Sequence, residues 1–225
     1  ALVEAIKKSP SLEFITIGKG LRLSLKETYA SDVFDASNQE IESGGVALIA
    51  WWLTTSVSAS LTSLRCGSNP IKDEGMAVLL DAVKDVALIE FDIANTEIGP
   101  PTAKKLAEVL SDPTPFTASL TSCCLLHNPL GEGVKDIVNV FEQTSRLRTL
   151  CGFEEGIEEV DWSNSKKGVA DVTLLAAELT AGRAIASIAY LDVLGCNLQG
   201  REEVGAQLMT AANEMERVHL RAHQV

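Results

Sequence analysis

Among the residues whose type and spacing suggest chemistry, we first consider Cys124 and Cys151. Both fall at the same position of consecutive copies of a strand-forming pattern. Neighbouring parallel strands lie about 4.8 Å apart, a Cα separation that a disulfide accepts. A redox switch or a soft-metal site is therefore conceivable. Two thiols without third and fourth ligands make a poor zinc site, so we favour two reduced thiols that are adjacent by chance.

The remaining candidate residues do not form a catalytic pattern. His127, His219 and His223 are not accompanied by a serine or cysteine nucleophile in a triad-like arrangement. The glycines on either side of Lys19 indicate a turn, and they lack the spacing of a phosphate-binding loop. We therefore predict that the chain is not an enzyme and has no catalytic, cofactor-binding or metal-binding residues.

A second group of residues is suited to binding. Side chains alternate along a strand, so the positions between the apolar ones point to the concave face, away from the helices. From Glu90 to Asp192 this face would carry acids and a tyrosine but no base. Such a strip suits a basic segment of another protein, although exposed strand residues of an acidic chain tend to be acidic in any case. The predicted binding residues are Arg65, Glu90, Asp92, Cys124, Cys151, Glu159, Asp161, Tyr190 and Asp192.

The elements that would position these residues follow one template, Ser60–Asp81. A short strand with leucines at 61 and 64 enters a turn at Asn69, and an amphipathic helix follows Gly75. Similar patterns start about every 27 residues in several places, a period typical of repeat proteins. The starts of the copies are Leu61, Leu88, Leu120, Leu147, Ile188 and Met215, the last with Val218, Leu220, His223 and Val225.

One strand and one helix cannot bury their apolar faces alone, so the units are expected to stack into parallel strands with helices outside. A polar residue where each strand ends can bond the backbone of the turn. The residues at this position are Asn69, Thr96, Asn128 and Cys196. Two irregular units, after Gly18 and after Leu150, contain a second strand-like piece in place of the regular helix.

These residues resemble the leucine-rich repeat family, specifically its ribonuclease-inhibitor-like subclass. The segment from Thr149 to Gly168 is also loosely similar to repeat proteins of algae and protists. The resemblance implies an α/β leucine-rich repeat solenoid, with a curved parallel sheet inside and helices outside. It implies a non-enzymatic interaction module or scaffold. The alternatives are a regulatory GTPase activator using Arg65 at the repeat edge, or a structural subunit that makes contacts through its helices.

Composition narrows the function classes further. The chain has 225 residues, 46% of them hydrophobic, which is enough for a single domain over 1–225. The net charge of −12 argues against binding to nucleic acid or anionic membranes, and no apolar stretch is long enough to insert into a membrane. Five cysteines without paired spacing favour an intracellular, cytoplasmic protein. The chain opens on part of a helical pattern, so we expect a fragment of a longer repeat protein.

Overall fold

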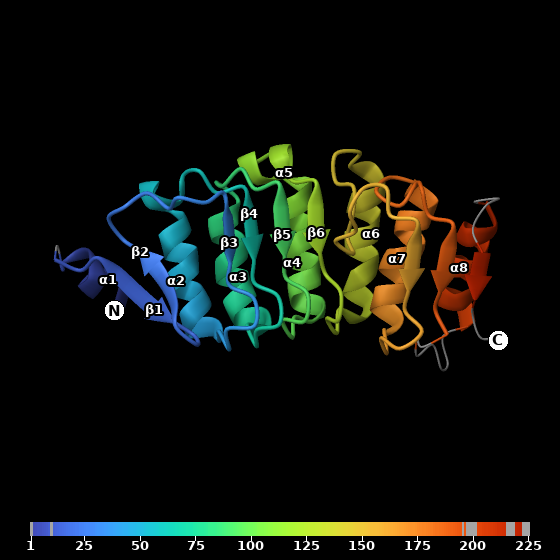
Figure 1. Cartoon of the computed structure of the whole chain (residues 1–225), viewed down its shortest axis with the longest axis horizontal. Coiled ribbons are helices and arrows are strands. Elements are labelled where there is room, and N and C mark those ends of the chain that lie inside the picture. Colours follow the sequence, from blue (N-terminus) through green and yellow to red (C-terminus); the bar gives the residue numbers. More distant parts are fainter. Residues whose placement is uncertain (1, 10, 195, 197–201, 215–218, 222–225) are drawn as a thin grey trace.

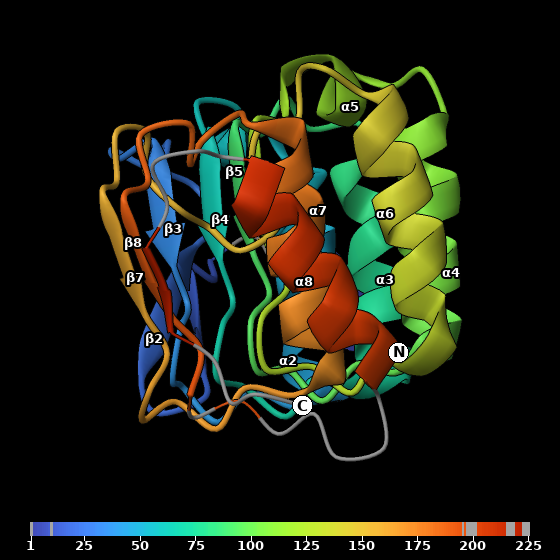
Figure 2. The ribbon, with the colours of Figure 1, turned by 90° about the vertical axis from the view of Figure 1, so that its right-hand side faces the viewer.

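The computed structural model describes residues 2–9, 11–194, 196, 202–214 and 219–221. The molecule is elongated, with its termini at opposite ends (Figure 1). Strands form one side and helices the other, as the end-on view shows (Figure 2). The positions Met215, Val218, His223 and Val225 of the last predicted copy lie outside the described residues.

The strands form three separate sheets. A hairpin pairs β1 (Phe14–Ile17) with β2 (Leu21–Ser24) in antiparallel register. A parallel sheet follows, with β3 (Val33–Asp35), β4 (Ser63–Arg65), β5 (Glu90–Asp92) and β6 (Ser122–Cys124) in sequence order. A second parallel sheet contains β7 (Glu159–Asp161), β8 (Tyr190–Asp192) and β9 (His219–Arg221).

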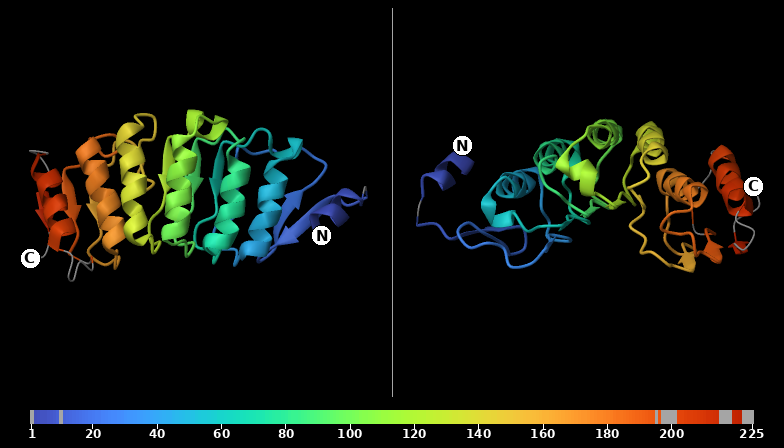
Figure 3. Two further views of the ribbon diagram at one scale, coloured as in Figure 1. Left: turned by 180° about the vertical axis from the view of Figure 1, so that it is seen from behind. Right: turned by 90° about the horizontal axis from the view of Figure 1, so that it is seen from above.

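The helices alternate with the strands along the chain. The described residues contain α1 (Leu2–Lys7), α2 (Ser43–Leu53), α3 (Lys72–Val83), α4 (Pro100–Ser111), α5 (Pro115–Ser119), α6 (Val134–Gln143), α7 (Val169–Ala181) and α8 (Glu202–Glu214). Short 3-10 turns lie at Ser56–Ser58 and Gly131–Gly133. Figure 3 shows α2, α3, α4, α6, α7 and α8 side by side on the face opposite the strands.

The predicted solenoid with one curved parallel sheet is wrong. The chain has a mixed α/β structure in which β6 and β7 do not pair, and the N-terminal strands form an antiparallel hairpin. The hairpin forms because Gly18 and Gly20, with φ of 53° and 118°, let the chain reverse within a few residues. After β6, a single parallel bridge joins Ser122 to Thr149, and the chain then leaves the sheet.

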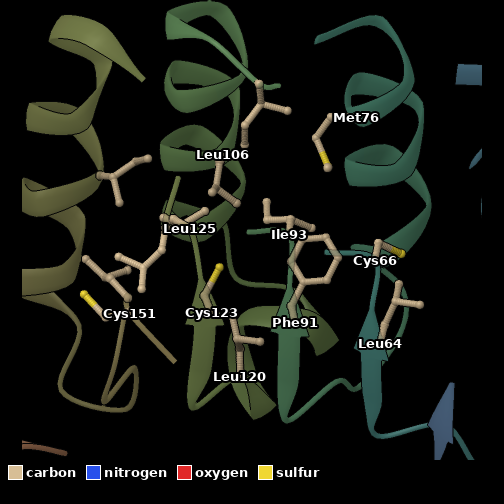
Figure 4. Packing of buried hydrophobic residues seen from close by; sticks show 14 of the residues in the cluster. Leu64, Cys66, Met76, Phe91, Ile93, Leu106, Leu120, Cys123, Leu125 and Cys151 are labelled. Atoms are coloured by element: carbon tan, nitrogen blue, oxygen red, sulfur yellow. The ribbon is translucent and has the colours of Figure 1, made fainter. Parts of the chain in front are cut away.

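The apolar ladder forms the core between strands and helices. The central residue of each strand in the first parallel sheet points toward the helices and is fully buried or nearly so, as Figure 4 shows for Leu64, Phe91 and Cys123. Buried hydrophobic residues form one cluster that runs from Ile6 to Ala211. Burial of a side chain as large as phenylalanine contributes roughly 1.5–3 kcal/mol to folding. The ladder therefore stabilises the packing of each strand against the helices.

The turn after each regular strand is held by a buried polar side chain, as expected. Asn69 Oδ1 accepts from the N–H groups of Gln39 and Ile41, both at 3.0 Å, while its Nδ2 donates to the carbonyls of Ala36 and Cys66. Asn128 makes the same pattern two units further, and Thr96 lies at the same position of the unit between them. These amides tie each turn to the preceding unit. Cys196, the fourth residue of the predicted set, is half-buried.

Candidate functional site

The predicted binding residues other than Cys151 lie on strands, on the face that the helices leave uncovered, in two groups instead of one strip. Cys151 lies outside the strands and is buried in the core. In the first parallel sheet, Arg65 aligns with Asp92, and Asp92 aligns with Cys124. In the second, Glu159 aligns with Tyr190, and Asp161 aligns with Asp192. The strands place them there because flanking residues of a three-residue strand point opposite to the central one.

The acid that begins the predicted strip is neutralised by its neighbour. Arg65 Nε and Nη2 donate to the two carboxylate oxygens of Glu90 at 2.9 and 3.0 Å, and Ser63 Oγ donates to Oε2 at 2.7 Å. Burial raises the pKa of Glu90, but the bonds from Arg65 and Ser63 outweigh it, and the net pKa is lowered. Arg65 is thus held in a bidentate pair, which does not favour its use as the inserted arginine of a GTPase activator.

The aspartates of the predicted strip have a structural task. Each ends its strand and accepts a hydrogen bond from the backbone N–H two residues later, at 2.8–3.0 Å. The pairs are Asp92 with Ala94, Asp161 with Ser163 and Asp192 with Leu194, and Asp35 bonds Ser37 in the same way. These turns explain why acids recur at this position without reference to a partner. Burial raises the pKa of Asp92.

The second parallel sheet carries the exposed part of the group. Glu159 is exposed, and Tyr190 lies opposite it on the next strand. The Tyr190 ring stacks on His219 with centroids 5.9 Å apart and planes 18° apart. Its hydroxyl donates to Asp192 Oδ2 at 3.3 Å, and Asp192 is only 2% exposed. An acid and two stacked rings therefore form one row across β7, β8 and β9.

Cys124 and Cys151 are adjacent, as predicted, and both are free cysteines. Cys124 Sγ lies 3.2 Å from the carbonyl oxygen of Cys151, to which the thiol donates. Burial raises the pKa of Cys124 to about 12 and raises that of Cys151 well above its usual value. Because the thiolate is the reactive form, this environment makes both sulfurs inert. The described residues contain no group of three or more side chains suited to a metal ion.

Sequence reasoning missed a buried carboxylate that ends the first parallel sheet. Glu178 of α7 is 1% exposed. Its Oε1 accepts from the N–H groups of Leu150 and Cys151 at 2.5 and 2.6 Å, and from Thr149 Oγ1 at 2.8 Å. These are donors that a further strand would otherwise use, which explains the break between the sheets. One sequence signal could have indicated this burial. Glu178 comes one turn after Leu174 and next to Leu179, which places it on the apolar side of the predicted helix.

A second missed cluster lies where β6 ends. Lys167 is 6% exposed, and its Nζ lies 2.6 Å from His127 Nε2 and 5.0 Å from the centre of the Trp162 ring. Asp171 accepts from the backbone N–H groups of His127 and Gly168 at 2.6 and 2.9 Å. Burial and the nearby ammonium lower the pKa of His127, so its neutral ring can accept a hydrogen bond from Lys167 Nζ. This cluster ties the loop before α7 to the first sheet.

Comparison with known proteins adds no identity. No protein-family model matches the chain, and no curated protein is significantly similar to it. The resemblance to leucine-rich repeat proteins therefore stays a prediction. Within the part of the chain that the structure describes, no helix combines the length and the apolar character needed to cross a membrane.

Proposed function

We propose that this chain is a non-enzymatic protein-binding module that holds a basic segment of another protein on the strand face of its second sheet. The observation that carries the proposal is the row of Glu159, Tyr190 and His219 on the uncovered side of β7, β8 and β9. A lysine or arginine over the Tyr190 ring would gain a cation–π contact and lie beside the Glu159 carboxylate.

Charge supports the second sheet over the first. In the first sheet Arg65 pairs with Glu90 and lies between Asp35 and Asp92, so one base already serves the acids of that region. Around β7 the exposed acids Glu154, Glu158 and Glu159 follow one another closely, and Arg148 pairs with Glu155. The proposal therefore narrows the predicted strip to Glu159 and Tyr190, and assigns Asp161 to its turn. Asp92, Cys124, Cys151 and Asp192 are assigned to the turns and the packing.

The test compares affinity capture by the native protein with capture by Glu159→Lys and by Tyr190→Ala, each quantified by mass spectrometry. We expect the captured amount of proteins with a basic segment to fall at least tenfold with either variant. The reason is that the charge attraction and the ring contact act on the same side chain of the partner. The matched control is Glu108→Lys, an exposed charge reversal on α4. Unchanged capture by both strand-face variants, or equal loss with Glu108→Lys, would show that this face is not the site.

A further inference from the structure

A groove lies on the opposite side of the molecule, among the last three helices. Its volume is about 1120 Å³, and it runs between α6 and α8 with α7 beneath. The view from above shows α7 closer to the strands than α6 is (Figure 3). The buried face of α7 explains this position, because Glu178 reaches the backbone of residues 150 and 151 and draws the helix inward.

The floor of the groove consists of small, uncharged side chains. They come from α7 at the three- and four-residue spacing of one helix face: Ala170, Thr173, Ala176, Ala177 and Thr180. A surface helix normally carries charges on its outer face. The charged residues of α7 are Asp171 and Glu178, and both are buried and bonded inside the protein. The outer face of α7 thus has the composition of a helix covered by another helix.

The walls of the groove are acidic. Glu142 of α6 and Glu203 and Glu214 of α8 line it, and none has an ion-pair partner among the described residues. The lysine of the wall, Lys135, is paired with Glu132 at 2.9 Å. An occupant with basic flanks would therefore meet three carboxylates to which no other described residue supplies a counter-charge.

We propose that this groove is a docking site for a basic amphipathic helix of a partner protein. The 13 residues of α7 correspond to a length of about 20 Å, which matches an occupant of three to four turns. Small residues on the floor let a helix approach closely, with its alanines or leucines on α7 and its lysines or arginines toward the walls. A second copy of this chain would bring another acidic surface, since the net charge is −12.

The probe is a fluorescein-labelled 14-residue peptide, cross-linked to hold a helix, with an Ala/Leu face flanked by lysines. Its binding to the native protein and to Thr173→Trp is followed by fluorescence anisotropy. Thr173 is half-buried on the groove floor, so a tryptophan there fills the groove without replacing a core residue. We expect micromolar binding to the native protein and at least tenfold weaker binding to the filled variant at an unchanged melting temperature.

Three controls separate the groove from general charge attraction and from the strand face. A peptide with glutamates in place of the lysines should not bind. The double variant Glu142→Lys, Glu203→Lys should bind the basic peptide about tenfold more weakly than the native protein does. Glu159→Lys on the strand face should leave its binding unchanged, which keeps this proposal independent of the one above.

Equal binding to native and Thr173→Trp protein, or no binding to the native protein, would overturn the proposal. So would size-exclusion chromatography that shows a native dimer dissociated by Thr173→Trp, because the occupant would then be a second copy.

Discussion

At the scale of single residues, Glu178 has the largest effect on the arrangement of the chain. It is a buried carboxylate whose Oε1 accepts three hydrogen bonds, while Oε2 is buried and has no hydrogen-bond partner among the described residues. Burial raises its pKa despite these donors. A carboxylate that is hard to ionise in the folded state binds its proton more tightly there than in the unfolded chain.

Glu178→Ala should lower the free energy of unfolding by about 3 kcal/mol, because it leaves the buried donors of Thr149, Leu150 and Cys151 without an acceptor. Glu178→Gln should cost less, since its amide oxygen can still accept. The native protein should lose stability relative to Glu178→Gln as pH rises from the ordinary glutamate range of about 4.3 through the raised folded pKa. Urea unfolding at several pH values measures this, and parallel pH profiles for the two proteins would contradict it.

At the scale of elements, the end of α6 depends on a side chain from a distant turn. Arg183 Nη1 donates to the carbonyls of Phe141, Thr144 and Leu147 at 2.9, 2.8 and 2.6 Å. The guanidinium also lies 4.4 Å from the centre of the Phe141 ring. Carbonyls at a helix C-terminus lack partners within the helix, so this one group both caps α6 and joins it to the segment after α7.

Arg183→Ala should lower the free energy of unfolding by about 1–2 kcal/mol, through loss of hydrogen bonds at a half-buried site. Arg183→Lys should restore only part of the loss, because an ammonium lacks the planar fork of donors. Arg146→Ala is the matched control, since Arg146 is an exposed arginine in the loop after α6. If chemical denaturation finds the same change for Arg183→Ala and Arg146→Ala, the capping role is wrong.

At the scale of the whole molecule, residues 151–158 separate the two parallel sheets along the chain. One hydrophobic core nevertheless continues from the first sheet to the second. The strand face and the helix-side groove lie on opposite sides. Occupation of one proposed site would therefore leave the other accessible.

Hydrogen exchange should reveal this junction as a weakly protected internal segment. The N–H groups of 154–157 make no hydrogen bond within the described residues, whereas those of Leu150 and Cys151 bond Glu178. Native-state exchange should be fast at 154–157 and slow at Leu150, Cys151 and Phe91. Glu178→Ala should speed exchange at Leu150 and Cys151 with little effect at Phe91. Equal protection of the junction and β5 would contradict this division.

Of the predicted binding residues, all but Cys151 lie in strands of the structure. Alternation along a short strand decides which side chains face the helices, and that is a local property readable from Leu64 or Phe91 and their neighbours. The ion pairing and burial of these side chains could not be predicted from the sequence, because they depend on contacts between units. The pairing of Arg65 with Glu90 and the stacking of Tyr190 on His219 arise only when separate strands come together.

The sequence by itself determined the order of strands and helices, the buried ladder and the asparagine-held turns, since each follows from residues a few positions apart. Only the tertiary structure decided where the sheet stops. Glu178 lies in a helix 27 residues beyond Cys151, and its carboxylate replaces the next strand as the acceptor for that backbone. The same contact sets the depth of α7 and so creates the groove. Such a contact depends on burial and on pairing across the chain, which a local pattern does not encode.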